Sequence, residues 1–385
     1  MKIVEAKVYI VETTGLRPVI VELLTDEGIS GIGEAAVGFG TGYSAAAAMI
    51  CELAENFVIG KEAARISDIW NDFYYLTFWG KGGGAILFAA ASAIEQALWD
   101  IKGKVLGVPI YELLGGQQHD SIRVYANGWS TTGFATPEEL AEKALKVVTA
   151  GYDAIKMYPL SKKHPTRNTN LHIKNRIITK EDYQRSVAAV QCVRSAIGQD
   201  ITLMVDVSSG GSPDIMTKLG QDLESYDLYW YEEPIDTVTL EAYPPLKEKV
   251  NIPIAAGERL YTRYGFRRAF ELQAFDIVQP DPGTCGGIME AFKIGAMAEA
   301  YQLRFAPHNC GGSVLTAAAL QVAICSSNFD ILETYPLRDD IYYDILENPL
   351  EKCIKNGRLE IPKTPGLGVT LNHQIIDQFL VYKVR

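Results

Sequence analysis

Eight short β-rich runs, each followed by a helical run, constrain the fold of this chain more than any other feature of its sequence. They read SIRVYAN, DAIKMY, ITLMVDV, DLYWYEE, IPIAAGE, FDIVQP, LRFAPH and FDILET, between about residues 120 and 346. Strands that alternate with helices form parallel sheets, and eight of them in one domain are typical of a (β/α) barrel. We therefore expect a barrel domain over residues 119–346.

The segments on either side of the barrel region predict a second, smaller domain. Residues 2–35 contain three β-rich runs separated by turn residues, as in an antiparallel meander. The Ala- and Leu-rich stretch 85–104 predicts a helix packed on that meander. We expect an N-terminal α+β domain over residues 1–118. We also expect a C-terminal segment, 347–385, that leaves the barrel and returns to the N-terminal domain.

Composition argues against several classes of function. The chain carries 36 basic and 47 acidic residues, a net charge of −11, whereas nucleic-acid binding relies on basic residues that neutralise phosphates. No apolar run approaches the ~20 residues of a membrane span, and the N-terminus lacks a signal-peptide pattern. The six cysteines show no close pairing. We expect a cytoplasmic protein with reduced cysteines and no nucleic-acid or membrane partner.

Three carboxylates end successive β-rich runs at equal spacing. Asp206, Glu232 and Glu258 are each 26 residues apart, so in a parallel barrel they would lie side by side at the C-terminal mouth. Their mutual repulsion calls for a divalent cation, and oxygen ligands select Mg²⁺ or Mn²⁺ over zinc. One strand-end acid is more often a helix N-cap, but three in register favour one metal ion per subunit. Glu233 points to the opposite face of its strand.

A long polar segment interrupts the second βα connection. Between residues 160 and 180 it carries an excess of basic residues, with no acid before Glu181: Lys162, Lys163, His164, Arg167, Lys174, Arg176 and Lys180. Loops that follow barrel strands emerge over the active-site face. The segment could therefore form a lid that draws in carboxylates. A solvated insertion or a contact between subunits is an equal alternative.

A set of motifs in order resembles the mandelate racemase subgroup of the enolase superfamily. They are DAIKMY, VDV, YEEP, AAGERLYTRYGFRRAF, DIVQPDPGTCGGI, APHN and ILET, with IWNDFY and ALWDIKGK in the first domain. The resemblance is greatest to galactonate dehydratase-like sugar-acid dehydratases. It implies an α/β fold in which an N-terminal α+β capping domain covers a modified (β/α)₇β TIM barrel. It also implies that Asp206, Glu232 and Glu258 hold Mg²⁺, which binds a substrate carboxylate and stabilises an enediolate.

The resemblance assigns roles to five further residues. His308 and Asp281 close neighbouring strands and would form the catalytic dyad of the family, in which the carboxylate orients the imidazole and raises its basicity. Glu333 resembles the acid that, protonated or strongly hydrogen-bonded, binds the substrate carboxylate; otherwise it would cap a helix. Lys156 matches the first lysine of a Lys-x-Lys motif, and Tyr158 stands in place of the second. Strand alternation puts Lys156 and Tyr158 on one face.

Two positions bear on the substrate. Ser208 stands where dehydratases of the galactonate and mannonate type carry a histidine that protonates the departing hydroxide. That departure could instead be assisted by His308, by Tyr158 or by the metal. Specificity in such a fold would lie in first-domain loops near residues 15–18 and 38–43. Arg17 in the first loop could contact a distal hydroxyl or carboxylate, or could be a surface residue.

These observations predict a hydro-lyase that removes the proton α to a carboxylate and eliminates water, which gives a 2-keto-3-deoxy acid. The alternative is a racemase, epimerase or cycloisomerase that uses the same enediolate on a hydroxy or sugar acid. Racemisation needs a competent base on each face of the α-carbon. Here one face has His308 and the other offers Tyr158 and Lys156, and this asymmetry favours dehydration. A non-enzymatic role is disfavoured because the metal ligands and dyad are all present. By resemblance we expect a homo-oligomer, from dimer to octamer.

Overall fold

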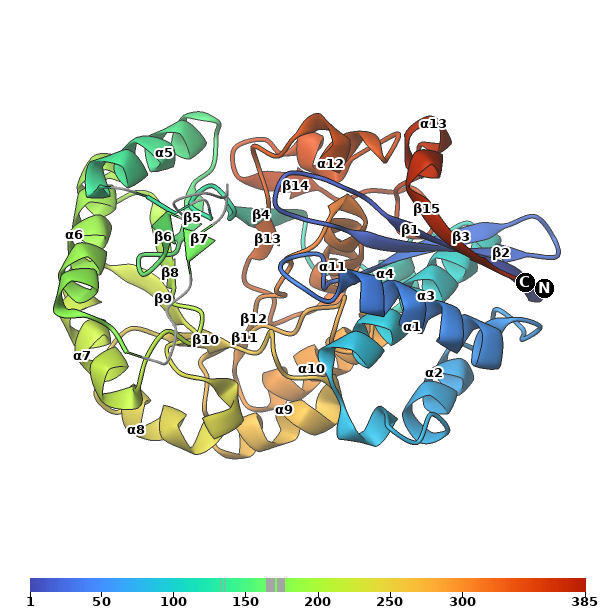
Figure 1. The fold of residues 1–385 in the computed structure, drawn as a ribbon, viewed down its shortest axis with the longest axis horizontal. Helices are drawn as coiled ribbons and strands as arrows, with labels where there is room; N and C mark the ends of the chain where they lie inside the picture. The colour runs from blue at the N-terminus through green and yellow to red at the C-terminus, as the bar shows by residue number, and fades with distance from the viewer. Residues whose placement is uncertain (132, 135, 164–169, 172–176) are drawn as a thin grey trace.

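The computed structural model describes residues 1–131, 133–134, 136–163, 170–171 and 177–385. Within these residues, eight parallel strands form the barrel sheet in the order β12-β11-β10-β9-β8-β5-β4-β13 (Figure 1). Their bounds are β4 Ser121–Ala126, β5 Ala154–Met157, β8 Thr202–Asp206, β9 Leu228–Glu232, β10 Ile254–Ala256, β11 Ile277–Val278, β12 Arg304–Phe305 and β13 Leu332–Thr334. Backbone hydrogen bonds from Phe305 to Asn328 and from Asp330 to Phe305 bring the approach to β13 against β12 and close the barrel.

A helix follows each of the first seven barrel strands, so the predicted (β/α)₇β arrangement is confirmed. The helices are α5 Pro137–Thr149, α6 Lys180–Ile197, α7 Pro213–Leu223, α8 Tyr243–Lys247, α9 Thr262–Glu271, α10 Ile288–Ala300 and α11 Ser313–Cys325. Local sequence begins them: Thr136 and Thr179 cap α5 and α6 by accepting backbone N–H groups with their side chains. Pro137 occupies the first turn of α5, where its missing N–H costs nothing.

One residue from each barrel strand, or from the segment beside it, fills the barrel interior. The cluster consists of buried side chains: Tyr125, Ala154, Met204, Trp230, Ala255, Ile277, Ala306 and Ile331. Large and small side chains share this layer, as the inner layers of such barrels require. The layer forms a buried floor below the residues that end the strands.

The second large sheet is antiparallel, with the order β15-β1-β2-β3. Its strands are β1 Ile3–Ile10, β2 Val19–Thr25, β3 Ser30–Ala35 and β15 Leu380–Val384, and its helices are α1 Tyr43–Leu53, α2 Ile66–Tyr75 and α3 Ala85–Leu106. Helix α3 matches the predicted helix to within two residues. Gly31 and Gly33 let β3 approach it, because an added Cβ would lie 2.2 and 2.0 Å from backbone oxygens of α3.

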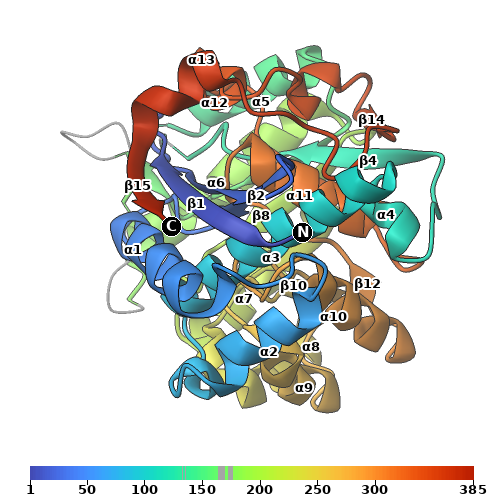
Figure 2. The same ribbon diagram turned by 90° about the vertical axis from the view of Figure 1, so that its right-hand side faces the viewer.

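The C-terminal strand β15 pairs antiparallel with β1, so both chain ends lie on this sheet (Figure 2). This pairing agrees with the expected return of the C-terminal segment, while the domain boundaries remain predictions. Among the helices that the structure describes, none is long and apolar enough to cross a membrane.

The basic segment predicted over the barrel mouth lies largely outside the described residues, which omit 164–169 and 172–176. The two short strands β6 (Lys162–Lys163) and β7 (Asn170–Leu171) pair within it, and α6 begins at Lys180. Its role as a lid stays a prediction.

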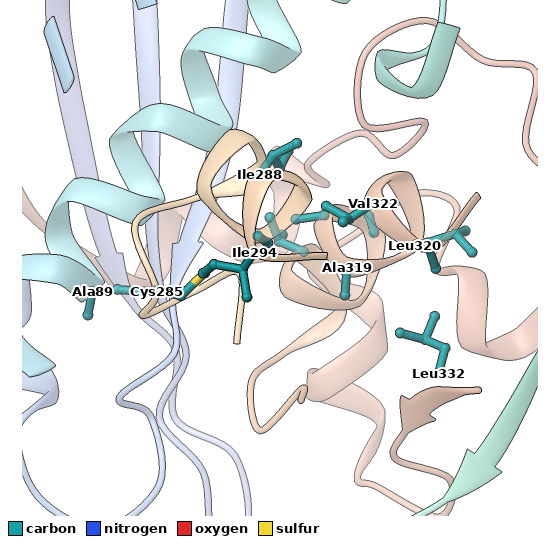
Figure 3. Packing of buried hydrophobic residues seen from close by; sticks show 14 of the residues in the cluster. Ala89, Cys285, Ile288, Ile294, Ala319, Leu320, Val322 and Leu332 are labelled. Atoms are coloured by element: carbon teal, nitrogen blue, oxygen red, sulfur yellow. The ribbon is translucent and has the colours of Figure 1, made fainter. Parts of the chain in front are cut away.

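Apolar packing joins the antiparallel domain to the barrel. Ala89 of α3 belongs to the same buried cluster as Cys285 and Ile288, which lie before and at the start of α10. Figure 3 shows these residues with Ile294 of α10 and Leu320 of α11. The two domains therefore share one continuous core.

Buried carboxylates of the antiparallel domain bind the barrel helices. Glu34, in β3, accepts two backbone N–H groups at the start of α11, at 2.5 and 2.9 Å. Glu95, on α3, accepts two at the start of α10, at 2.7 and 3.0 Å. Helix N-termini attract negative charge, whereas burial raises the pKa of Glu34 to about 8 and that of Glu95 to about 7. These contacts fix the position of one domain on the other.

Replacing Glu95 by Gln should destabilise the protein. Glu95 receives donors on both carboxylate oxygens, including Trp99 Nε1 at 2.8 Å, and the NH₂ group of a glutamine would face a donor. We expect the free energy of unfolding to fall by about 1–3 kcal/mol, measured by chemical denaturation above pH 8. The control is Glu52→Gln on the exposed face of α1; equal losses in both variants would contradict the role given to Glu95.

Candidate active site

The predicted site residues gather at the C-terminal ends of the barrel strands. Asp206 and Glu232 are the last residues of β8 and β9 and pair in register, and Glu258 follows β10 by two residues. A cavity of about 450 Å³ opens here between the two domains. Its lining includes six of the predicted residues: Tyr158, Asp206, Ser208, Glu258, Asp281 and His308.

Lys156 is the central cation of the site. Its fully buried Nζ lies 2.7 Å from Glu232 Oε1, 3.0 Å from Glu333 Oε1 and 3.6 Å from Asp206 Oδ2. Burial alone would lower the pKa of Lys156, but the charges of Glu232 and Glu333 raise it well above its usual value. Nζ also lies 5.4 Å from the centre of the Tyr125 ring in the barrel floor. The ammonium is therefore held ionised among three acids.

The two acids at the ends of β8 and β9 are strained electrostatically. Burial and, to a smaller extent, the neighbouring acids together raise the pKa of Glu232 to about 8 in spite of Lys156. Burial also raises the pKa of Asp206, with Lys156 opposing and Glu258 adding to the shift. Trp230 Nε1 donates to Glu232 Oε2 at 2.9 Å. One ammonium does not neutralise this cluster, so a further cation would stabilise its charged form.

The donor set fits a divalent cation, although the side chains do not form a coordination sphere. Carboxylate oxygens are ligands that Mg²⁺ prefers. Within the described part of the chain, no three His, Cys, Asp or Glu side chains converge as metal ligands. Lys156 contacts Glu232, and His308 Nε2 lies 2.7 Å from Glu258 Oε2. The side chains predicted as ligands are thus adjacent but are paired with protein cations.

His308 and Asp281 form the predicted pair. Nδ1 of His308 lies 2.7 Å from Asp281 Oδ2, and the backbone N–H of Gly283 donates to the other oxygen of Asp281 at 2.7 Å. Burial lowers the pKa of His308, but Glu258, Glu333 and Asp281 together raise it well above its usual value. With Nδ1–H donated to Asp281, Nε2 is directed to the acids around the cavity.

Glu333 is held ionised by hydrogen bonds and charges. Burial raises its pKa, but Lys156 and His308 outweigh burial and lower it. The backbone N–H of Asn309 donates to Glu333 Oε2 at 2.9 Å, and Asn127 donates to Glu333 Oε1. Of the two states expected from the sequence, the structure therefore favours strong hydrogen bonding over protonation.

Asn127, which the sequence analysis missed, connects Glu333 to Tyr158. Its Nδ2 also donates to Tyr158 Oη at 2.8 Å and to Tyr335 Oη at 3.1 Å. Burial raises the pKa of Tyr158 well above its usual value although Lys156 opposes this. The phenol therefore stays protonated near neutral pH. The position of Asn127, one residue after the first barrel strand, is the signal that could have identified it.

Two predicted substrate contacts differ in position. Ser208, with a left-handed φ of 47°, lines the cavity and directs its N–H and Oγ to Asp206 Oδ1 at 2.7 and 3.1 Å. Arg17 is exposed, its guanidinium lies 5.0 Å from the Tyr43 ring centre, and it is not in the cavity lining. From the other predicted loop, Phe39 and Thr41 do line the cavity. A substrate contact by Arg17 stays a prediction.

Arg259 and Arg338 line the cavity and were also missed. Arg259 Nη1 lies 2.8 Å from Glu258 Oε1 and also pairs with Glu233. Glu233, which follows the last residue of β9, accepts from Ser209 Oγ at 3.2 Å. The cavity lining thus contains two arginines, of which Arg259 is already paired with two carboxylates.

The chain matches two family descriptions along most of its length. Residues 139–375 match the family described as enolase C-terminal domain-like, and residues 8–115 match the N-terminal domain of mandelate racemase and muconate lactonizing enzyme. The chain belongs to this family of the enolase superfamily. The resemblance and fold class predicted from the sequence are both confirmed.

Relatives in the family are dehydratases. A D-galactonate dehydratase from Ralstonia pickettii is 34% identical over 94% of this chain and 90% of its own length, and one from Variovorax paradoxus is 36% identical over 94% and 90%. A solved structure from Mesorhizobium loti, provisionally described as a dehydratase, is 45% identical with a TM-score of 0.96 and full coverage of both chains. These comparisons support the predicted assignment as an enzyme of the hydro-lyase class.

Replacing Lys156 by Met should strongly destabilise the protein without added metal. The change leaves Asp206, Glu232 and Glu333 buried with no central cation, and breaking a buried ion pair costs about 3–5 kcal/mol. Chemical denaturation in a chelating buffer measures the difference. The matched control is Lys352→Met, which removes an exposed pair with Asp344 and should cost under about 1 kcal/mol. A similar small loss in both variants would refute the central role of Lys156.

Proposed function

We propose that this chain is a Mg²⁺-dependent sugar-acid dehydratase, with Mn²⁺ as a possible substitute. The observation that carries the proposal is a network of contacts that joins Lys156 to Glu333 and Glu232, and the His308–Asp281 pair to Glu333 and Glu258. This network lies beside the cavity that His308 and Asp281 line. The names of the relatives add the reaction class and a substrate class, a sugar acid such as D-galactonate.

Asp206, Glu232 and Glu258 would hold the cation, which when bound supplies positive charge to a substrate carboxylate whose α-carbon is losing a proton. Lys156 and Glu333 lie next to these carboxylates. Asn127 and Asn309 hold Glu333 in place by donating hydrogen bonds to it. Ser208 keeps Asp206 oriented through two hydrogen bonds to one oxygen.

His308 is the proposed base. Asp281 accepts Nδ1–H at 2.7 Å. The surrounding acids raise the pKa of His308 well above its usual value, so Nε2 must first lose its proton; a cation held by Glu258 would offset the charge of that carboxylate and favour the neutral imidazole, whose Nε2 lone pair would then take the α-proton. Asp281 then stabilises the imidazolium. The same Nε2–H can protonate the hydroxyl on the β-carbon, so the C–O bond breaks and water leaves. The histidine absent at position 208 is then unnecessary.

Dehydration fits this site better than racemisation does. Racemisation needs a second base on the opposite face of the α-carbon, and the raised pKa of Tyr158 keeps its phenol protonated. The pKa of Lys156 is also raised, so its ammonium has no lone pair to accept a proton. Tyr158, which lines the cavity, would instead donate a hydrogen bond to the substrate. A cytoplasmic location and a homo-oligomeric state remain predictions.

Removal of the metal should abolish dehydration and reduce stability. We expect chelation to eliminate 2-keto acid formation, and added Mg²⁺ to raise the thermal midpoint in the wild type. Asp206→Asn should lose most of the Mg²⁺-dependent rise, because it removes one anionic ligand. Asp214→Asn on the exposed start of α7 is the control. A wild type that turns over fully in chelator would disprove the metal requirement.

The His308→Asn variant should lose turnover by a factor of roughly 10³ or more but still bind Mg²⁺, because it removes the proposed proton acceptor. Tyr158→Phe should keep measurable activity, since a protonated phenol contributes only a hydrogen bond. Formation of 2-keto acid measures both. Exchange of the α-proton with solvent deuterium shows which face of the α-carbon loses the proton. Exchange catalysed by the His308→Asn variant would show that a residue other than His308 takes the proton.

A further inference from the structure

A second cavity, of about 510 Å³, adjoins the candidate active site. Phe39, Thr131 and Arg338 line both cavities, so the second opens directly beside the first. The mechanism proposed above uses no residue of the second cavity. Its own lining adds Lys143 and Lys146 from the outer face of α5. A substrate that reacts at His308 could therefore extend past Arg338 into this space.

The second cavity is positively charged in a chain whose net charge is −11. Its lining holds three cations, Lys143, Lys146 and Arg338, against one carboxylate, Asp339. Asp339 is already bonded, since it caps α12 (Asp340–Asp344) and accepts the backbone N–H of Thr14 at 2.5 Å. Even with the Lys143–Glu139 pair at 3.3 Å, positive charge remains in excess. Such a lining favours an anion over a neutral hydroxyl group.

Arg338 is held in place by the wall between the cavities. Its guanidinium carbon lies 4.6 Å from the centre of the Tyr335 ring. Gly128 lies against both side chains, since an added Cβ would be 2.5 Å from the Tyr335 ring and 3.2 Å from Arg338 Nη2. A planar guanidinium fixed in this way is preorganised to donate two parallel hydrogen bonds to a carboxylate or a phosphate.

Two buried donors of this wall have no hydrogen-bond partner among the described residues: Arg338 Nε and Trp129 Nε1. Trp129 is only 7% exposed and lines the second cavity. A buried donor without an acceptor is costly, and native structures rarely leave one unpaired. An anionic ligand in the second cavity would supply the acceptors.

We propose that Arg338, assisted by Trp129 and Lys146, binds a second anionic group at the end of the substrate remote from the reacting carboxylate. This inference rests on the proposed function and narrows its substrate class. The substrate would be a sugar acid with an anion at each end, either a diacid or a phosphorylated monoacid. The relatives named above are called dehydratases of D-galactonate, which carries one carboxylate.

The first test compares three substrates of equal carbon number: a sugar monoacid, the corresponding diacid and the terminally phosphorylated monoacid. Wild-type enzyme with Mg²⁺ should show a kcat/KM at least roughly ten-fold higher for one of the two-anion acids, because a charge-assisted bidentate contact is worth that much. The preferred acid identifies the second anion as carboxylate or phosphate. Equal values for all three substrates, or a preference for the monoacid, would overturn the inference while the proposed function stands.

The second test uses Arg338→Met, with Arg268→Met on the exposed face of α9 as the matched control. Arg338→Met should raise the KM for the preferred two-anion acid by roughly ten-fold or more, and the KM for the monoacid by a much smaller factor. Lys146→Met should weaken the same KM to a smaller degree, and Arg268→Met should alter nothing. An equal rise in KM for all substrates would assign Arg338 a structural role instead and refute the proposal.

Direct binding separates failure of this inference from failure of the proposed function. Calorimetric titration of Mg²⁺-loaded wild type with the diacid and the phosphorylated acid needs no turnover. If no acid is dehydrated, the proposed function fails, yet loss of two-anion binding in Arg338→Met with intact folding would still support the inference. Absence of binding by either two-anion acid in the wild type would overturn it. Circular dichroism of each variant confirms folding.

Discussion

The buried ammonium of Lys156 is the interaction on which the arrangement of the candidate site depends. Acids from three strands lie within 2.7–3.6 Å of its Nζ, and each would repel the others without it. The barrel floor beneath them is buried and largely apolar, so their charges are poorly screened. One cation among three acids still leaves an excess of negative charge, and the raised pKa values of Asp206 and Glu232 express that excess. Binding of a divalent cation would relieve it.

The sequence predicted those parts of the fold and site that follow from chain periodicity. Equal spacing placed Asp206, Glu232 and Glu258 at adjacent strand ends, because each βα unit advances one strand around the barrel. The same reasoning brought His308 beside Asp281, and the structure gives them a 2.7 Å contact. The assignment to the hydro-lyases came from motifs, which carry family history that spacing alone does not.

Side-chain direction was beyond the reach of the sequence. Nothing in the pattern indicates that Asn127 bonds both Glu333 and Tyr158, since an asparagine after a strand is usually a turn residue. Arg338 follows the last barrel strand in an irregular segment, where no periodicity assigns a face. Arg17, chosen from its loop, turned to the Tyr43 ring and away from the cavity. Residues outside regular elements need coordinates because their backbone sets no repeating direction.

The two domains contribute different parts of the site: the barrel provides the charged residues, and a loop of the antiparallel domain provides part of the cavity lining. The charged residues at the strand ends sit on a closed sheet, whereas Phe39 and Thr41 reach the cavity from a loop after β3. Glu34 and Glu95 fix that domain by binding the N-termini of α11 and α10, the helices on either side of the strand that ends near His308. A change in the loop can thus alter the substrate without moving the base, because the contacts that set the domain position lie in the shared core and not in the loop.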